Sequence, residues 1–486
     1  MAIIEAVNRF VWGIPALIMI LSVGIFLTIK TRWAQLRYFP RAVRGFLVKP
    51  ANSDGISPYR ALCTALAATV GTGNLVGVAG AIAVGGPGSI FWMWVCGILG
   101  MATKFAEATL AVRYRVPDGK GGYMGGPMYM VQQAMGAKWK PLAGIYCFFG
   151  VVAAFGVGSA TQINAMLGGI NGAVTALGGT ESKFVNLLIG VILAILCVLV
   201  LLGGAKRIGA AAAFLVPFAS VFYILLCLGV LYIKAPAIPD AFFAILTGAF
   251  TPGAVTGGVV GSAFRALRIG ASRGVFTNEA GMGTAGMAHA SAQVDHPVQQ
   301  GMMGIIEVFV DTILICTMTA LAILCSGVDI PYGQDLGVKI TANAFSYVYG
   351  DWVHIPLAIA LSCFAIATVI GWGLYGVRCA EYLFGGNMWK CFGIFQAFSV
   401  ILGAVLSTGV VWSLSEIANG LMAIPNLIIL VSLSPELYRL INEYQKIYGS
   451  KTANGGSYEN FNKCKSLQPV SHAEIPSLCC EGKERR

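Results

Sequence analysis

The sequence predicts an all-α polytopic membrane protein with about eleven transmembrane helices, in which one N-terminal helix precedes two inverted repeats of five helices. Three observations lead to this fold class. The 486 residues are 57% hydrophobic and only 11% charged, whereas soluble proteins carry about 25% charged residues. Eleven apolar stretches approach the roughly 20 residues that a membrane-spanning helix needs. Two of these stretches, five apart in order, are interrupted by glycine and polar residues.

The expected spans follow one another with short connections. They lie near residues 10–29, 57–84, 88–112, 141–171, 184–203, 208–233, 256–290, 301–326, 354–376, 389–410 and 414–433. The first lacks the basic start and the cleavage site of a signal peptide, so we interpret it as a retained span. We divide the chain into an N-terminal helix with a basic loop (1–50), a transporter-like core of ten helices (51–442) and a polar tail (443–486), partly disordered.

Basic residues are concentrated in alternate loops. The loops after the first, third, fifth and ninth spans contain Lys30, Arg32, Arg37, Arg41, Arg44, Lys49, Arg113, Arg115, Lys120, Lys138, Lys140, Lys206, Arg207, Arg378 and Lys390. Because short cytoplasmic loops are enriched in Lys and Arg, we expect the N-terminus outside the cell (plasma, or inner) membrane and the tail in the cytoplasm. The same distribution accounts for the net charge of +11, so we expect no nucleic-acid partner.

The second span is interrupted at its centre by the sequence TVGTGN at residues 69–74. Each glycine there weakens a helix interior by about 1 kcal/mol relative to alanine. Local unwinding is therefore expected. Gly73 and Gly77 also form a small-xxx-small pattern that is typical of helix packing in membranes, which is the alternative interpretation of this span.

The seventh span is too long for one straight crossing and carries RGVFTNEAGMG at residues 273–283. Non-helical backbone is tolerated at membrane depth only where it is buried or lines a cavity. Its carbonyls can bind a cation, and the N-termini of its half-helices can face a carboxylate. If the N-terminal helix is set aside, the interrupted spans are the first and the sixth of ten. Because five is an odd number, the second set of five helices would cross the membrane in the opposite orientation to the first set. This arrangement predicts inverted repeats around a transport site.

These two segments resemble those of the alanine or glycine:cation symporter family. The resemblance is carried by VGTGN (70–74), by NEAGMG (278–283) and by the loop that follows, and it extends from Phe10 to about Arg439. It implies a fold like that of the leucine transporter and sodium-coupled uptake of a small amino acid, alanine or glycine. Sodium would be the coupling ion, and neither another cofactor nor an enzymatic activity is expected.

In the second span, we expect the unwound backbone to bind both solutes. The carbonyls of Ala67 and Val70 are assigned to sodium, because neutral oxygens suit a hard monovalent cation. The amides of Thr72 and Gly73 are assigned to the substrate carboxylate. Asn74 either bridges the break or adds an oxygen ligand, and a helix cap is its alternative role.

In the seventh span, Phe276 and Thr277 are expected to present carbonyls to the substrate ammonium. Asn278 supplies a polar group at the break. Met282 is a further candidate for the pocket wall, although a Met at such a position is commonly packing. Glu279 is a candidate for coupling or gating, because ionisable groups are costly within a membrane; a structural link to Arg273 or to a backbone amide is the alternative.

Two further spans supply side chains at helical spacing. Phe155 and Gln162 lie seven residues apart, which places them on one face of a regular helix, and both are assigned to the substrate. A helix–helix hydrogen bond is the alternative for Gln162. Thr368 and Trp372 lie four residues apart, also on one face. The resemblance implies that Thr368 binds sodium and that Trp372 closes the pocket, with packing as the alternative for Trp372.

Other ionisable residues also lie in apolar sequence. Asp311 in the eighth span is a candidate for ion binding or gating. Glu107 follows Lys104 by three residues, so we expect a local ion pair there. His289 and His296 are the only histidines near one another, and a metal site at them is disfavoured because no third ligand is clear.

Three alternatives to sodium symport are considered. A proton-coupled amino-acid carrier of the same fold would use Glu279 or Asp311 as its proton site. An intramembrane enzyme is disfavoured, because the sequence lacks the HExxH, GxSxG and GxxxxGK[ST] patterns. A channel is disfavoured, because channels commonly repeat their filter by symmetry, whereas the two interruptions here differ.

Overall fold

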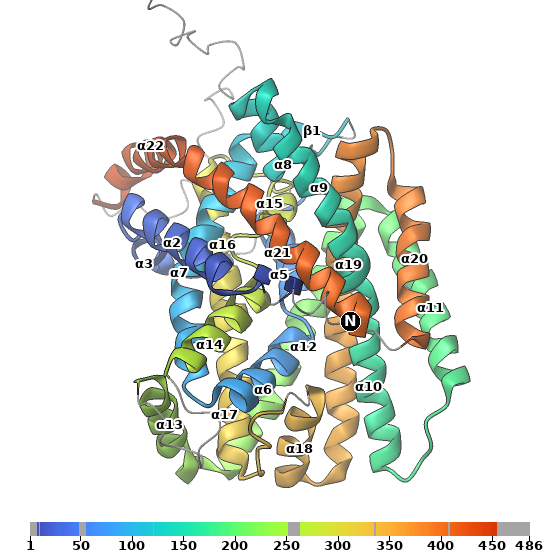
Figure 1. The fold of residues 1–486 in the computed structure, drawn as a ribbon. Coiled ribbons are helices and arrows are strands. Elements are labelled where there is room, and N and C mark those ends of the chain that lie inside the picture. Colours follow the sequence, from blue (N-terminus) through green and yellow to red (C-terminus); the bar gives the residue numbers. More distant parts are fainter. Residues whose placement is uncertain are drawn as a thin grey trace, which may run out of the picture. The chain divides into compact units, whose positions relative to one another are not determined.

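The computed structural model describes residues 7–8, 10–47, 55–119, 121–250, 263–334, 337–406 and 409–453, and it is almost entirely helical (Figure 1). The helices before the first π-helical turn are α2 (Ile14–Lys30), α3 (Ala34–Arg37), α4 (Phe39–Leu47), α5 (Pro58–Thr69), α6 (Gly73–Gly85), α7 (Ser89–Arg113) and α8 (Pro127–Met130). A two-residue hairpin pairs β1 (Val116–Pro117) with β2 (Tyr123–Met124) in antiparallel register.

The helices of the middle of the chain include two π-helical turns and two 3₁₀ turns. They are η1 (Val131–Met135), η2 (Ala137–Trp139), α9 (Lys140–Phe155), η3 (Gly156–Ala160), α10 (Thr161–Ala176), α11 (Lys183–Leu202), α12 (Gly204–Ile233), η4 (Ala235–Ala237), α13 (Ile238–Phe250), α14 (Ala263–Asn278) and α15 (Thr284–His289).

The remaining helices complete the bundle. They are α16 (Pro297–Val308), the π-helical η5 (Phe309–Cys316), α17 (Thr317–Ser326), α18 (Val338–Tyr349), η6 (Asp351–Val353), α19 (His354–Phe384), α20 (Trp389–Val405), α21 (Gly409–Ser432) and α22 (Ser434–Ala453). The chain divides into two units, Met1–Leu440 and Ile441–Arg486. All the sites described below belong to the first unit.

Within the described residues, seven helices are long and apolar enough to cross a membrane, and the bent pair α5–α6 makes an eighth. The expected count of eleven spans is therefore matched only in part. The expected spans at 10–29 and 389–410 coincide with α2 and α20, which are apolar but shorter. Residues 256–262 of the seventh expected span lie outside the described residues, and its remainder forms α14 and α15. The eleven-helix topology stays a prediction.

The helices that lie where only connections were expected include α13 and α18. Their buried apolar side chains form one core cluster with α6, α7 and α17, to which Val78, Ile82, Met93, Ile245 and Ile340 contribute. This cluster packs α6, the second half of the first interrupted span, against its neighbours. Burial of apolar surface against protein explains why these connections fold as helices.

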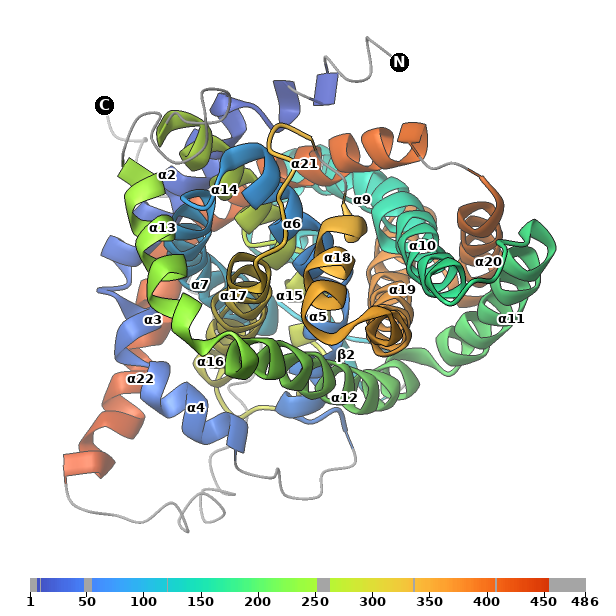
Figure 2. The ribbon, with the colours of Figure 1, turned by 90° about the horizontal axis from the view of Figure 1, so that it is seen from below.

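Both predicted interruptions are present. The axis of α5 is bent by 44° from that of α6 across Val70–Thr72, and α14 is separated from α15 by residues 279–283. The two interrupted segments lie side by side and run in opposite directions (Figures 1 and 2). The carbonyl of Ile56, before α5, accepts from the amide of Gln293, after α15, and Gly85 at the end of α6 faces Ile269 in α14.

Candidate functional site

The first break replaces backbone hydrogen bonds with a side-chain bond. The Gly71 amide donates to Asn74 Oδ1 (2.9 Å) rather than to the carbonyl of Ala67, four residues earlier. An unwound turn at this point therefore leaves helix carbonyls without their usual partners. Ala67 and Val70 are fully buried, so these oxygens face protein rather than bulk water.

The hydroxyl of Thr368 faces the same break from α19. A Cβ built on Gly71 would lie 2.7 Å from Thr368 Oγ1, and one built on Gly371 would lie 3.2 Å from the Ala67 carbonyl carbon. Thr368 Oγ1 donates its hydrogen to the Phe364 carbonyl (3.0 Å). The oxygen lone pairs of Thr368 therefore remain available beside the freed carbonyls of α5, as the predicted cation site requires.

The second break is built from left-handed backbone. Glu279 has φ +53°, Gly281 has φ +96° and Gly283 has φ +77°. Such values are unusual for a residue with a side chain, so Glu279 is held in a strained conformation. The Ala280 amide donates to Asn278 Oδ1 (2.9 Å), which caps the end of α14.

Side chains of the second break lie against the first. A Cβ on Gly73 would be 3.9 Å from both Phe276 Cε1 and Thr277 Cγ2. Phe276 also makes an edge contact with Trp12 (6.0 Å between ring centroids). The predicted carboxylate side of the site, at Gly73, and its predicted ammonium side, at Phe276 and Thr277, are therefore brought together.

A continuous hydrogen-bonded chain joins the two breaks through η5. Asn74 Nδ2 donates to Asp311 Oδ1 (2.7 Å), and Thr312 Oγ1 donates to Asp311 Oδ2 (2.7 Å). Asn278 Nδ2 in turn donates to Thr312 Oγ1 (3.1 Å). Asp311, Asn74 and Thr312 are fully buried. The carboxylate of Asp311 thus lies between the breaks, where a candidate coupling group would be placed.

The carboxylate of Glu279 links the second break to α19. Trp372 Nε1 donates to Glu279 Oε1 (3.1 Å), and Thr284 Oγ1 donates to Glu279 Oε2 (2.7 Å). Thr368 and Trp372 therefore share one face of α19. Thr368 faces the first break, and Trp372 faces the second. Met282 is fully buried in the second break, where its amide donates to the Glu279 carbonyl (3.2 Å).

The expectation that Phe155 and Gln162 share a helix face is wrong. The π-helical turn η3 lies between them, and its wider turn shifts the register of the residues that follow. Gln162 Oε1 accepts from Thr72 Oγ1 (2.9 Å) at the first break. The ring of Phe155 instead packs against Phe395 and Phe398 of α20, with centroid distances of 4.8 and 6.4 Å.

The expected local ion pair between Lys104 and Glu107 is also wrong. Lys104 Nζ instead binds Glu307 Oε1 (2.8 Å), and His289 Nε2 contacts the other oxygen of Glu307 (2.9 Å). Both ion-pair side chains are fully buried. The helix α16 packs closely on α7. Lys104 therefore binds Glu307 on α16 rather than Glu107, which lies one turn away on α7.

Glu107 supports the second break instead. Its Oε1 accepts from the amides of Gly281 (2.9 Å) and Gly283 (3.1 Å) and from Asn426 Nδ2 (2.7 Å). Asn426 Nδ2 also donates to the Gly281 carbonyl (2.9 Å). Glu107 and Asn426 are site residues that the sequence analysis missed. A signal for Asn426 was present, because an amide side chain in an apolar span requires a partner.

The two neighbouring histidines are used in other ways. His289 Nδ1 bonds to Gln300 Nε2 (2.7 Å), and His296 Nδ1 accepts from the Val298 amide (3.2 Å) as a cap of α16. Within the part of the chain that the structure describes, no group of three His, Cys, Asp or Glu side chains is placed to hold a metal ion.

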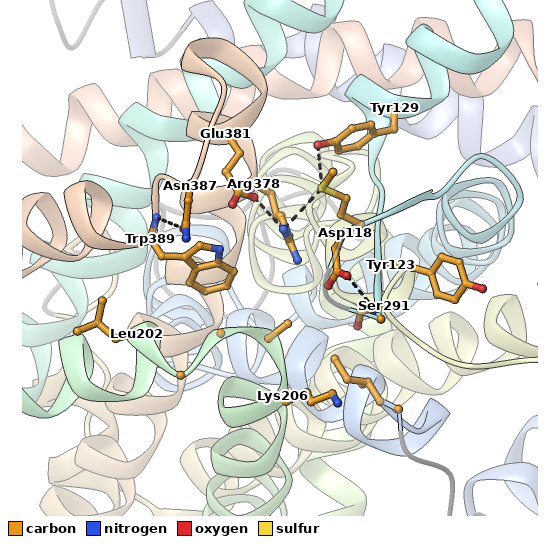
Figure 3. Close-up of a pocket in the computed structure, with 18 of the residues that line it drawn as sticks. Asp118, Tyr123, Tyr129, Leu202, Lys206, Ser291, Arg378, Glu381, Asn387 and Trp389 are labelled. Carbon is orange, nitrogen blue, oxygen red and sulfur yellow. Dashed lines mark hydrogen bonds and ion pairs between the residues drawn. The ribbon is translucent and has the colours of Figure 1, made fainter.

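A cavity of about 610 Å³ opens at the end of the bundle where α5 begins and α15 and α19 end (Figure 3). Its lining includes the ion pair of Arg378 with Glu381 (2.8 Å), together with Lys206, Asp118 and Trp389. The predicted site residues at the breaks do not line it. It lies among the loops in which the sequence concentrates basic residues.

The fold matches a solved transporter. It superposes on the crystal structure of MhsT in complex with L-phenylalanine with a TM-score of 0.57, covering 79% of this chain and 90% of that chain at 16% identity. MhsT has the leucine-transporter fold. Two oppositely directed, interrupted helices with polar groups at both breaks thus define a multi-pass membrane protein of this fold.

The chain belongs to the sodium:alanine symporter family, whose model matches residues 1–456. It is 41% identical to the sodium/alanine symporter AgcS of Methanococcus maripaludis over 89% of this chain and 94% of the relative. It is 34% identical to a probable sodium/glutamine symporter, GlnT, of Bacillus subtilis over 91% of this chain and 90% of the relative. These findings confirm the resemblance and make the protein a transporter of a sodium-coupled amino-acid symporter family, not an enzyme.

Proposed function

We propose that the protein imports alanine or glycine together with sodium by alternating access across the cell membrane. The relative named a sodium/alanine symporter supports this substrate class. The close approach of Gly73 to Phe276 and Thr277 also favours a small amino acid. The relative named as a probable glutamine symporter makes glutamine the competitor that any assay must include.

The observation that carries the proposal is the contact of the first break with Thr368. The Gly71 amide is bound by Asn74, which frees the Ala67 carbonyl, and Thr368 Oγ1 faces Gly71 from α19. We place sodium between Ala67, Val70 and Thr368, where neutral oxygens replace its hydration shell. A sodium ion at this point would hold α5 against α19 and so stiffen the first break before the amino acid binds.

The amino acid is placed between the two breaks. The amides of Thr72 and Gly73 bind its carboxylate, and the carbonyls of Phe276 and Thr277 bind its ammonium. Gln162 positions Thr72 through their hydrogen bond. Trp372 positions the second break through its hydrogen bond to Glu279. Gln162 and Trp372 therefore orient the site.

The cytoplasmic part of the transport path is assigned to the cavity among the basic loops (Figure 3). This assignment follows from the expected orientation, with the N-terminus outside and the tail in the cytoplasm. The driving force suffices for uptake. One charge moving through 100 mV contributes about 2.3 kcal/mol, and a tenfold sodium gradient adds about 1.4 kcal/mol. Their sum supports roughly 500-fold accumulation.

Removal of one hydroxyl tests the sodium site. Thr368→Val keeps the side-chain shape but deletes Oγ1, so the sodium concentration for half-maximal uptake should rise about tenfold, which corresponds to about 1.4 kcal/mol. Thr368→Ser should restore it. Thr175→Val is the matched control, because Thr175 makes the same bond to a carbonyl four residues earlier on an exposed helix face. An unchanged sodium dependence in Thr368→Val would refute the assignment.

A proton-coupled carrier of the same fold is the second candidate. The buried carboxylates of Asp311 and Glu279 support it, and a Bacillus subtilis relative that is 31% identical is named a putative sodium/proton-dependent alanine carrier. The test is uptake without sodium under an inward proton gradient. Proton-driven uptake that Asp311→Asn or Glu279→Gln abolishes would favour this candidate, whereas sodium symport predicts no such uptake.

A further inference from the structure

Four buried polar atoms around the second break have no hydrogen-bond partner among the described residues. They are Glu107 Oε2 on α7, Tyr146 OH on α9, Tyr375 OH on α19 and Asn426 Oδ1 on α21. All four side chains are fully buried. Leaving a polar atom unbonded in a protein interior costs about 1–3 kcal/mol, so four such atoms in one region point to a ligand.

Each of the other three side chains interacts with Glu107. Tyr146 and Tyr375 each lie within electrostatic range of Glu107 and of one another. Asn426 contacts the same carboxylate, since its Nδ2 donates to Glu107 Oε1. The orientation of the Asn426 amide is fixed, because Nδ2 has two acceptors, Glu107 Oε1 and the Gly281 carbonyl. Its Oδ1 therefore points away from them, toward Gly283.

The charges around this cluster do not balance. The single lysine of the region, Lys104, lies within electrostatic range of Glu107, Glu279 and Glu307, but its ammonium is bound to Glu307. His289 contacts the other oxygen of Glu307 and bonds to Gln300 at its second nitrogen, so it too is committed to groups other than Glu107. When ionised, Glu107 therefore lacks a positive partner of its own, and a buried carboxylate in that position is costly.

We propose that this cluster, Glu107 Oε2 with Asn426 Oδ1 and the hydroxyls of Tyr146 and Tyr375, is a second buried sodium site. One carboxylate with three neutral oxygens matches the charge of a monovalent cation and its preference for hard oxygen ligands. The ion would supply the positive partner of Glu107, which binds the amides of Gly281 and Gly283. Sodium would thereby stiffen the second break, as the site at Thr368 would stiffen the first.

The test removes only the two phenolic oxygens. We would compare the wild type with Tyr146→Phe/Tyr375→Phe, using purified full-length protein in detergent, for its melting temperature in sodium and in potassium at constant ionic strength and for bound ²²Na⁺. Sodium stabilises in proportion to its binding to the folded state. The double variant should need about tenfold more sodium for the same stabilisation, and each single variant should fall between it and the wild type.

Tyr223→Phe is the matched control. Tyr223 is as buried, but its hydroxyl is hydrogen-bonded to Thr319 (2.9 Å), so this variant should melt earlier in sodium and in potassium by the same amount. In the Thr368→Val background, the proposed second site should still bind sodium with unchanged affinity, and the added Tyr146→Phe/Tyr375→Phe changes should weaken that binding about tenfold. This binding measurement does not depend on transport, so it separates failure of this site from failure of the proposed function.

Two results would overturn the site. Wild-type sodium binding in Tyr146→Phe/Tyr375→Phe would mean that the hydroxyls bind water or nothing. A melting temperature of the double variant that differs from the wild-type value by the same amount in sodium and in potassium would lead to the same conclusion, because deleting an unbonded buried hydroxyl is itself neutral or favourable in either salt.

Discussion

Asn74 Nδ2 donates to Asp311 Oδ1 at 2.7 Å, while Asn74 Oδ1 accepts from the Gly71 amide at 2.9 Å. One side chain therefore binds the first backbone amide that α5 leaves without a helical partner and connects the first break to η5. The chain continues from Asp311 through Thr312 to Asn278 in the second break. The two breaks are thus joined by hydrogen bonds as well as by the contacts of Gly73 with Phe276 and Thr277.

Asn74→Ala should therefore remove both folding stability and transport. It leaves the Gly71 amide and one oxygen of Asp311 unbonded, and unbonded buried groups cost about 1–3 kcal/mol each, so a loss of roughly 2–6 kcal/mol is expected. Thermal unfolding and labelled-alanine uptake measure the two effects. Asn343→Ala, at an exposed position of α18, should change stability by less than about 0.5 kcal/mol. Wild-type uptake by Asn74→Ala would show that the hydrogen-bonded chain is dispensable.

Gly71→Ala should abolish sodium-dependent uptake with little loss of helix content. The added methyl group would lie 2.7 Å from Thr368 Oγ1 and 3.5 Å from Gln162 Oε1, so it would occupy the space beside the proposed sodium ligands. Gly168→Ala on α10 is the control, because no atom lies within 4 Å of its added methyl group and alanine favours a helix by up to about 1 kcal/mol. Equal sodium affinity in the two variants would contradict the placement of the site.

The expected orientation can be tested by labelling. In a background without reactive cysteines, Asn387→Cys at the rim of the cavity should react with a membrane-impermeant maleimide only from the cytoplasmic side. Asn343→Cys, in the connection after the eighth expected span, should react only from the outside. The reverse pattern would mean that the basic loops do not face the cytoplasm, and the cavity would then belong to the outer part of the path.

Stability should depend on pH through Glu436, which lies outside the spans. Hydrogen bonds from Arg439 lower the pKa of Glu436, against the opposing effect of partial burial, and Arg113 binds the same carboxylate at 3.0 Å. A carboxyl group whose pKa is lowered by folding stabilises the folded state at pH values above its ordinary pKa. This contribution disappears as the pH falls through the lowered pKa. Glu436→Gln should therefore cost about 0.5 kcal/mol at pH 7, given solvent screening, and this cost should shrink as the pH falls below the ordinary pKa of the carboxyl group. A difference in melting temperature that stays constant as the pH falls would refute this.

The breaks could be predicted from sequence because they are local. Paired glycines with Thr and Asn at 71–74 weaken a helix wherever they occur, and the spacing of Thr368 and Trp372 survives because α19 is regular over both. Phe155 and Gln162 could not be placed in the same way, since a π-helical turn inside an apolar run has no sequence signature that distinguishes it.

The support of the second break could not be predicted either. Glu107 has Lys104 one turn away, and the choice between that neighbour and the amides of Gly281 and Gly283 depends on how α16 and α15 pack on α7. The convergence of Tyr146, Tyr375 and Asn426 likewise joins segments up to 280 positions apart. Such contacts are properties of the tertiary packing, which single-sequence periodicity does not contain.

The most direct measurement is uptake of labelled alanine into proteoliposomes with an inward sodium gradient, compared with potassium in place of sodium. Our account predicts alanine uptake that requires sodium. Unlabelled glycine should compete with labelled alanine, and glutamine should compete only weakly. Accumulation should respond to an inside-negative potential, because a charge moves with the amino acid. Absence of alanine uptake by folded protein under any gradient would contradict the proposed substrate, and equal uptake in both salts would contradict sodium coupling.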